Sequence, residues 1–260
     1  MAKQTILFLT FLFTCFITLA QIEKIDTDRP DQTESTFTVP KKWFQVETGF
    51  VREKISDLGA IWSLPTILSK YGLSEKWELR LLTEYFSYAS SYSRRLTDTA
   101  GFLPLTIGFK VNLLEEKGIR PRISLIGHAG FNRLSSRMTA SHYGSFFAPS
   151  LVFTFQNSTS ENAAIGYNLG VEWEDTKEPP AWIYTLAYGS NIGERWYAYI
   201  EVFGAAIKHE PPQHTIDAGI AYWINNNMKV DLSGGFGLNS FTPRNYIAVG
   251  FSFRIKTGKK

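Results

Sequence analysis

The sequence predicts an all-β protein, a transmembrane antiparallel β-barrel of about 12 strands with short periplasmic turns and longer extracellular loops. Three observations lead to this fold class. Past Lys42 almost every segment alternates apolar and polar residues with a period of two, the alternating runs are about ten to thirteen residues long, and the connections alternate between short and long. A tilted strand needs about 9–11 residues to cross a bilayer.

The chain begins with residues 1–20, which are typical of a secretory signal peptide. Lys3 is followed by the apolar run ILFLTFLFTCFITLA, and cleavage is expected after Ala20. An uncleaved membrane anchor is the alternative. Cys15, the only cysteine, lies in the apolar run, so the mature chain would contain no thiol. Export without cysteines is typical of a bacterial envelope protein, and we expect the chain in the cell outer membrane after export through the inner membrane.

The mature chain divides into a polar lead-in or plug segment, residues 21–42, and the barrel, residues 43–260. Its size suits one large all-β domain. The formal net charge is only +3, and Lys and Arg are scattered among Asp and Glu. Because nucleic-acid binding requires a basic face, this distribution excludes nucleic acid as a partner.

Twelve alternating runs account for the expected strands. The clearest is 163–173, where Ile165 and Leu169 lie on the apolar face and Asn168 lies on the other. The runs lie near residues 43–53, 63–73, 77–88, 102–114, 120–131, 146–157, 162–173, 181–192, 196–207, 214–224, 228–238 and 245–255.

The connections between these runs differ in length in a regular way. Five are tight, namely SEK (74–76), EEKG (115–118), STSE (158–161), GER (193–195) and NNN (225–227). The longer ones are EKISDLGA, SSYSRRLTDTAG, RLSSRMTASHYG, EDTKEPP, KHEPPQ and NSFTPR. Short turns on the side of both termini and long loops on the other are the layout of an outer-membrane barrel with an even number of strands.

Aromatic residues gather where the tight turns meet the strands, as expected for a girdle at the membrane interface. A simple preference of Trp and Tyr for strands is the alternative. The residues concerned are Tyr71, Trp77, Trp196, Tyr222 and Trp223.

The polar face of the runs carries many charges at positions that fall within strands. If these side chains point inward they share a lumen and can pair with one another. Charges are nearly absent from the opposite face, so Arg is expected to be tolerated at Asn168 but not at Leu169. The charged positions are Glu47, Glu78, Arg80, Glu84, Lys110, Arg122, Glu172, Glu201 and Asp231.

A lumen of about 12 strands should be narrow and partly occupied. Tyr197, Tyr199 and Phe203 share a face with Glu201, which predicts an aromatic patch on the lumen wall that would suit a solute with a ring. An error in the expected register is the alternative interpretation.

The stretch IDTDRPDQTESTFTVPKKWFQVETGF, then KYGLSEKWELRL, GFKVNL, YWINNNMKVDLSGGFGLNS and GFSFRI, resembles a bacterial outer-membrane β-barrel family, labelled transporters and associated with a MetA pathway of phenol degradation. The resemblance implies a channel or transporter for small compounds, aromatic or hydrophobic ones among them. The solute itself is unknown. The end IKTGKK departs from the aromatic residue on which such barrels often finish, which bears on recognition by the barrel-assembly machinery. Outer-membrane lipid is the other expected partner.

The polar stretch TDRPDQTES precedes the first expected strand. Pro30 and the Asp residues disfavour a regular element there. We expect a short plug that folds into the barrel mouth and pairs with wall charges such as Arg80 or Arg254. A solvated lead-in that merely positions the first strand is the alternative. The plug candidates are Asp28, Arg29, Asp31 and Glu34.

The sequence offers little for an enzyme, a metal site or a cofactor. A lipid-modifying enzyme of the outer membrane would need Ser, His and Asn or Asp within reach of one another. Three of the four histidines fall in or beside expected long loops, and neither G-x-S-x-G nor H-E-x-x-H occurs. A structural or adhesive barrel without transport is the stronger alternative. The histidines are His128, His142, His209 and His214.

Overall fold

The computed structural model describes residues 24–56, 59–90, 99–103, 105–131, 147–173 and 179–258. The expected signal peptide, residues 1–20, lies outside these ranges. So do residues 91–98 and 132–146, which hold most of two expected long loops and include His142. No helix in the described ranges is long and apolar enough to cross a membrane.

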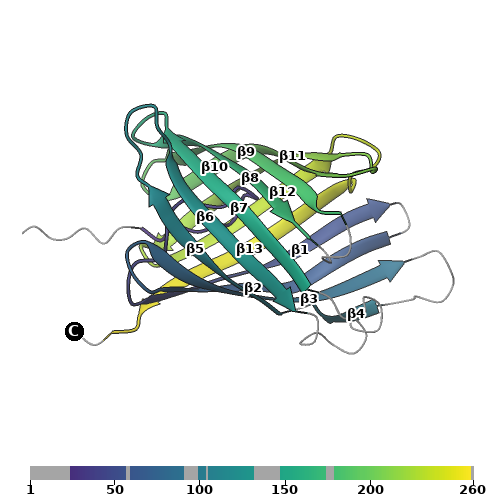
Figure 1. Ribbon diagram of the computed structural model, residues 1–260, viewed down its shortest axis with the longest axis horizontal. Helices are drawn as coiled ribbons and strands as arrows, with labels where there is room; N and C mark the ends of the chain where they lie inside the picture. The colour runs from purple at the N-terminus through teal and green to yellow at the C-terminus, as the bar shows by residue number, and fades with distance from the viewer. Residues whose placement is uncertain are drawn as a thin grey trace, which may run out of the picture.

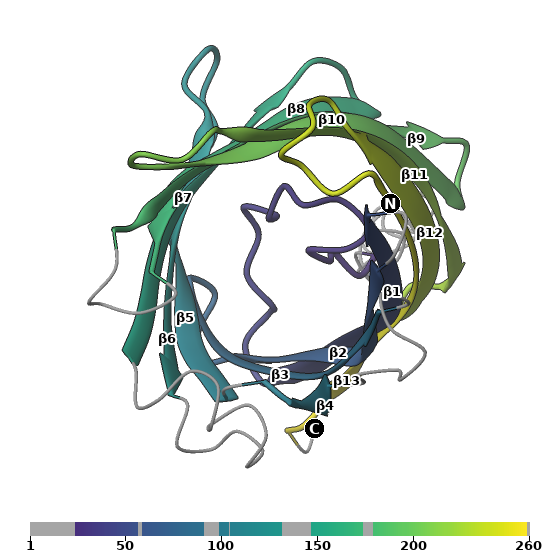
Figure 2. The same ribbon diagram turned by 90° about the vertical axis from the view of Figure 1, so that its right-hand side faces the viewer.

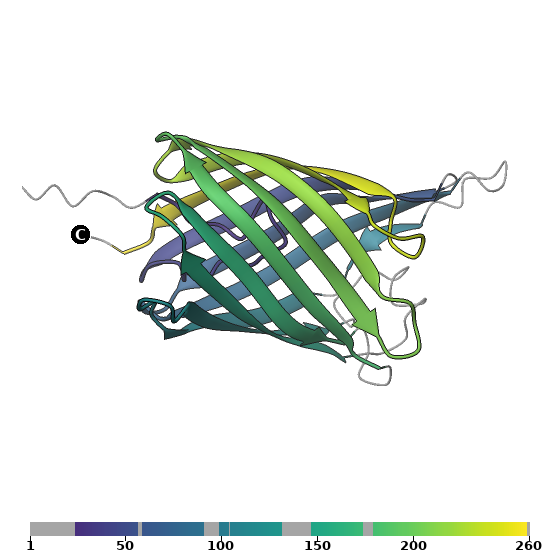
Figure 3. The same ribbon diagram turned by 90° about the horizontal axis from the view of Figure 1, so that it is seen from above.

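Antiparallel strands form one closed barrel, with neighbouring strands tilted in the same sense (Figures 1 and 3). Each strand pairs with the next along the chain from β5 to β13, β13 pairs with β1, and pairings of β1 with β2 and of β2 with β3 close the ring. The strands are β1 (Trp43–Ser56), β2 (Gly59–Gly72), β3 (Trp77–Ser90), β4 (Thr99–Phe102), β5 (Leu105–Leu114), β6 (Arg122–Phe131), β7 (Phe147–Ser158), β8 (Ala163–Glu172), β9 (Ala181–Ile192), β10 (Trp196–Ile207), β11 (Gln213–Asn225), β12 (Met228–Gly237) and β13 (Asn245–Lys256).

The two strands β4 and β5 together occupy one position in the ring. Residues 77–82 of β3 pair with β5, and residues 85–88 of β3 pair with β4. Pro104, which has no N–H to donate to a neighbour, lies between them in the sequence. The ring therefore has 12 strand positions, the number that the alternating runs predicted.

The barrel wall is apolar outside and polar inside. Leu151 and Leu169 expose 47% and 57% of their surface, whereas Thr154 and Asn168 are buried in the lumen. A water-soluble barrel of this size would reverse the arrangement. Because lipid replaces water around the wall, exposed aliphatic side chains carry no penalty there. The predicted assignment of the two faces is confirmed.

Two details of the sequence-based prediction are wrong. The expected long loop at residues 53–60 is mostly strand, since Lys54 pairs with Ala60 and Ser56 pairs with Gly59. Trp223 is not part of an outer girdle, because its indole Nε1 points inward and donates to the carbonyl of Ile25 at 3.2 Å.

Residues 24–42, which we call the luminal segment, lie inside the barrel (Figure 2). The segment starts at the short-turn end, where the N–H of Ile25 donates to the carbonyl of Asn226 at 2.8 Å. It returns to the same end, where the N–H of Lys42 donates to the carbonyl of Gly72 at 2.8 Å. Between these points it forms no strand, so its polar groups must find partners on the barrel wall.

Candidate functional site: the luminal segment and the barrel wall

The carboxylate of Asp28 is the centre of the contact between the segment and the wall. Its Oδ1 lies 2.8 Å from Nζ of Lys110, and its Oδ2 lies 2.9 Å from Nη1 of Arg80 and also contacts Lys70. These three cations come from the neighbouring strands β2, β3 and β5, and Lys70 and Arg80 are opposite each other in register. Burial raises the pKa of Asp28, but the three cations outweigh it and hold the pKa well below its usual range.

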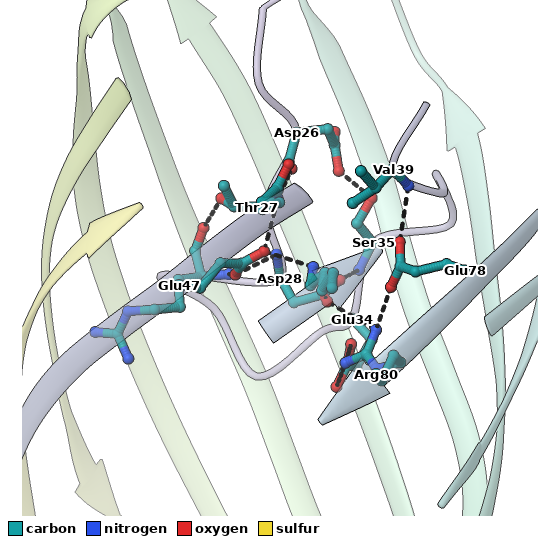
Figure 4. A network of polar contacts seen from close by, with 12 residues as sticks. Asp26, Thr27, Asp28, Glu34, Ser35, Val39, Glu47, Glu78 and Arg80 are labelled. Carbon is teal, nitrogen blue, oxygen red and sulfur yellow. Dashed lines mark hydrogen bonds and ion pairs between the residues drawn. The ribbon is translucent and has the colours of Figure 1, made fainter. Parts of the chain in front are cut away.

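Wall carboxylates accept hydrogen bonds from the segment's backbone (Figure 4). Oε2 of Glu47 accepts from the N–H groups of Asp28 and Arg29, at 3.0 and 3.2 Å. Oε2 of Glu78 accepts from the N–H of Val39 at 2.7 Å. Hydrogen bonds to ionised groups are about twice as strong as neutral ones. The buried glutamates thus supply the partners that the strandless segment lacks.

Glu34 covers Arg80 on its other side. Nη2 of Arg80 donates to both oxygens of Glu34, at 3.1 and 2.9 Å. Nε of Arg80 donates to Nε2 of His128 at 3.1 Å. The ring nitrogen that accepts this bond carries no proton, so His128 is a neutral imidazole protonated on Nδ1. Arg80, on β3, therefore connects the segment to β6, the strand beyond β5.

Arg29 fits into a slot that two glycines leave in the wall. Gly49 and Gly250 are opposite each other in the pairing of β1 with β13. A Cβ added at Gly250 would lie 2.3 Å from Nε of Arg29, and one added at Gly49 would lie 2.6 Å from its Cζ. Next to the slot, Asp231 accepts from Nη2 of Arg29 at 3.0 Å. The side chain of the segment and the glycines of the wall are complementary in shape.

Aromatic residues and a carboxylate hold the opposite flank of the segment. The hydroxyl oxygen of Tyr199 lies 3.3 Å from the carbonyl oxygen of Pro30. Glu201 accepts from the N–H of Gln32 at 2.7 Å and from the hydroxyl of Thr33. The hydroxyl groups of Thr33 and Thr185 are 2.6 Å apart. Tyr199 and Glu201 therefore both face the lumen, as the alternation predicted.

A second tyrosine on β10 contacts an acidic residue of the segment. The hydroxyl of Tyr197 donates to Oδ2 of Asp31 at 3.4 Å. Burial raises the pKa of Asp31 to about 7. The aromatic patch predicted on this strand therefore contacts the segment directly.

Two cavities lie against the segment, one toward each end of the barrel. The cavity at the short-turn end has a volume of about 500 Å³ and is lined by Trp223 and Lys229 as well as by the segment. The cavity toward the long loops has a volume of about 410 Å³, and Gln32 and Glu34 form part of its lining. Glu34 lines both cavities. The segment thus lies between two spaces within the lumen.

The other predicted lumen residues lie at different levels of the wall. Glu84 accepts a hydrogen bond from the hydroxyl of Ser63 at 2.6 Å, away from the segment. Arg122 lies over the ring of Phe37, 4.2 Å from its centroid. Glu172 lines the cavity toward the long loops.

Arg254, a predicted partner of the plug, lies at the short-turn end of β13. Its Nε donates to Oδ1 of Asn227 at 3.0 Å, and its guanidinium lies over the ring of Trp43. It lines the short-turn cavity together with residues of the segment. Of the two predicted wall charges, Arg80 forms ion pairs with Asp28 and Glu34 of the segment.

Several polar residues of the lumen were not placed there by the sequence-based prediction. Lys70 and Lys229 lie near strand ends, where the face is hard to assign from alternation. Asp217 could have been predicted, because it shares one face of β11 with Thr215 and Gly219, two positions away on either side. It accepts a hydrogen bond from the hydroxyl of Tyr199 at 2.9 Å. His128 had no distinguishing motif.

The described histidines do not form a common site. His128 faces the lumen beside Arg80, whereas Nδ1 of His214 pairs with the hydroxyl of Tyr184 at 2.7 Å on the outer face. His209 lies in the 208–212 connection with a positive φ of 70°. Among the described residues, no group of three or more His, Cys, Asp or Glu side chains could hold a metal ion.

Comparison with known proteins gives a family and a fold. Residues 27–255 match the model of the family described as "Putative MetA-pathway of phenol degradation". No curated protein sequence matches the chain significantly. The structure is similar to an outer membrane channel from Pseudomonas putida F1, with a TM-score of 0.67, 10% identity and coverage of 89% of this chain and 100% of that one. It is also similar to the NanC porin, with a TM-score of 0.53, 8% identity and coverage of 82% and 100%.

Proposed function

Because the chain belongs to this family of the MetA pathway of phenol degradation, we propose that it is an outer-membrane channel for small compounds, aromatic or hydrophobic ones among them, and that its luminal segment is a plug. The observation that carries the proposal is the position of the segment. It lies inside a closed barrel between a cavity of about 500 Å³ and one of about 410 Å³. A solute that crosses the lumen must pass residues 28–35.

The cavity toward the long loops has the chemistry of a site for a small ring. Ligand pockets are commonly about 300–1,000 Å³, mostly apolar, with a few polar groups that fix orientation. Phe203, Tyr246 and Ile183 supply apolar surface, and Gln32 and Asn168 supply amides at the level of the segment. The mixture favours a solute that combines a ring with a polar substituent.

The contacts of the segment are suited to a plug that moves. Its polar groups are held by side chains of the wall rather than by strand pairing. Release of the segment would therefore leave the barrel ladder complete. Each lost contact to an ionised group costs about 1.5–3 kcal/mol, so several together would keep the plug in place most of the time.

Deletion of residues 26–35 tests this function. The variant should still fold and migrate faster unboiled than boiled on SDS gels, because no strand pairing is removed. In planar bilayers it should conduct more than the parent, and in liposomes it should release or admit phenol faster. A control is Ile119→Ala in the connection between β5 and β6, whose side chain is 99% exposed and lines neither cavity, and which should behave like the parent in all three measurements.

A folded deletion variant that conducts no better than the parent would contradict the plug. A parent and a variant that both fail to pass any solute would instead favour a structural or adhesive barrel. The two results differ in whether the lumen conducts at all, so the assay separates the alternatives.

A further inference from the structure

We propose that Arg80 is a recognition site for the carboxylate of an acidic aromatic solute, and that Glu34 occupies this site as an internal substitute. The proposal rests on the proposed channel function and narrows its substrate class. It implies that a solute with a ring and a carboxylate binds in the cavity toward the long loops, displaces Glu34 and so loosens the plug.

The geometry around Arg80 distinguishes Glu34 from the other carboxylates. Arg80 is 97% buried, and the side chain of Glu34 covers its Nη2 with contacts at 2.9 and 3.1 Å. The Glu34 side chain is itself 27% exposed, whereas those of Asp28 and Glu78 are 6% and 0% exposed. Of these three partners of Arg80, only Glu34 can be reached readily by a molecule in the lumen.

Glu34 is also the carboxylate that the cluster can lose. Nη1 of Arg80 keeps contacts with Asp28 at 2.9 Å and with Glu78 at 3.3 Å when Glu34 leaves. The cluster formed by the described residues contains one more carboxylate than cations. Its cations are Lys70, Arg80 and Lys110, and its carboxylates are Asp28, Glu34, Glu47 and Glu78.

The titration of Glu34 agrees with its role as the surplus carboxylate. Burial raises the pKa of Glu34 most, Arg80 lowers it and the neighbouring charge of Asp28 raises it, and the net pKa is about 7. His128, which also faces Arg80, is neutral and adds no charge. Near neutral pH Glu34 is therefore protonated part of the time and is then a weak partner for Arg80.

The space next to Glu34 matches the rest of such a solute. Glu34 and His128 line the cavity of about 410 Å³, and apolar groups of Ile126, Val152 and Phe203 face the same space. A carboxylate placed on Nη2 of Arg80 would put an attached ring among them. Guanidinium groups bind carboxylates strongly because both partners are charged and the hydrogen bonds are directional.

Benzoate and benzyl alcohol are suitable probes because they share a ring and differ in charge. Binding to the purified mature protein is measured by equilibrium dialysis at pH 6 and pH 8. Benzoate remains ionised at both pH values, so only the protein titrates. At pH 8 a competing group with a pKa of about 7 is uncharged about a tenth of the time, and the affinity for benzoate should then be about tenfold weaker than its limit.

The wild-type protein should thus bind benzoate several-fold more tightly at pH 6 than at pH 8, and benzyl alcohol equally at both. Glu34→Gln should bind benzoate tightly at both pH values. Glu194→Gln is the control, because Glu194 is exposed in the short turn between β9 and β10 and lines neither cavity. It should keep the wild-type pH dependence. Unboiled migration on SDS gels shows that each variant is folded.

Two results would overturn the proposal. One is saturable benzoate binding with the same pH dependence in Glu34→Gln as in the wild type. The other is the absence of saturable benzoate binding from both proteins. Passage of benzyl alcohol through the deletion variant tests the channel independently, so the channel function can stand when the carboxylate site fails.

Discussion

The guanidinium of Arg29 and the carboxylate of Asp231 are 3.0 Å apart, although the two residues are separated by most of the chain. Arg29 belongs to the luminal segment and Asp231 to β12. The pair exists because Gly49 and Gly250 leave room for the guanidinium against the wall. The wall therefore has space for the Arg29 side chain. Substitutions that remove its contact with Asp231 test how firmly the segment is held.

Arg29→Ala should weaken the plug without affecting the barrel. The charge-assisted contact to Asp231 is lost, which should cost the docked state on the order of 1.5–3 kcal/mol. Planar-bilayer recordings should show a higher mean conductance than the wild type but a lower one than the deletion of residues 26–35. Conductance equal to the wild type would mean that Arg29 does not hold the segment.

Gly250→Ala tests the same contact from the side of the wall. The new Cβ would lie 2.3 Å from Nε of Arg29, so the guanidinium must move away from Asp231. We expect an increase in conductance in the same direction as for Arg29→Ala. Gly234→Ala is the control, because its Cβ would meet only a backbone oxygen at 3.1 Å and would not touch the segment.

Acid should release the segment from the wall because it protonates the carboxylate of Asp28. Its pKa is lowered in the docked state, so its contribution to docking is complete above its ordinary value of 3.8 and is lost as the pH falls below it. Hydrogen exchange of the amides of residues 28–36 should show lower protection below pH 3.8 than at pH 5, after correction for intrinsic rates, since Asp31 and Glu34, with pKa values raised to about 7, are already protonated at pH 5. Asp28→Asn should be poorly protected throughout and lack this acid transition.

Leu151 and Ser150 are adjacent residues on opposite faces of β7. Leu151→Arg places a charge in lipid and should lower the free energy of unfolding by up to about 2–4 kcal/mol, depending on its depth in the bilayer. Ser150→Arg points into the lumen near Glu172 and should have a much smaller effect. Equal losses in urea unfolding from lipid vesicles would show that the two faces are assigned wrongly.

Strand positions and faces were predictable because alternation is a local property. For the strand that contains Ile165 and Leu169, the alternation in the sequence predicts the same outer face that the structure shows. Alternation does not report what lies inside a lumen. Asn168 was expected to tolerate Arg, but it is 98% buried and faces the luminal segment. Its side-chain oxygen accepts from the N–H of Glu34 at 2.7 Å once the amide is oriented to satisfy both of its atoms.

The sequence predicted the charged residues of the site but not the residues that they contact. The charge-rich stretch around Pro30 and the inward face of Arg80 were visible in the sequence. The slot for Arg29 was not, because it depends on Gly49 and Gly250 being opposite each other in register. Register joins residues 201 positions apart in the chain. Lys70 and Lys229 were missed because both lie near strand ends. There, a change of one residue in the assumed register assigns a side chain to the opposite face.

A reversible covalent bond between the segment and the wall tests the central claim most directly. The hydroxyl groups of Thr33 and Thr185 are 2.6 Å apart, and the mature chain expected after cleavage at Ala20 has no cysteine of its own. Thr33→Cys combined with Thr185→Cys should therefore form a single disulfide. If the luminal segment is a movable plug, the oxidised protein should pass neither ions nor phenol, and reduction with dithiothreitol should restore conductance. An oxidised protein that carries the disulfide and conducts as well as the reduced one would contradict the account.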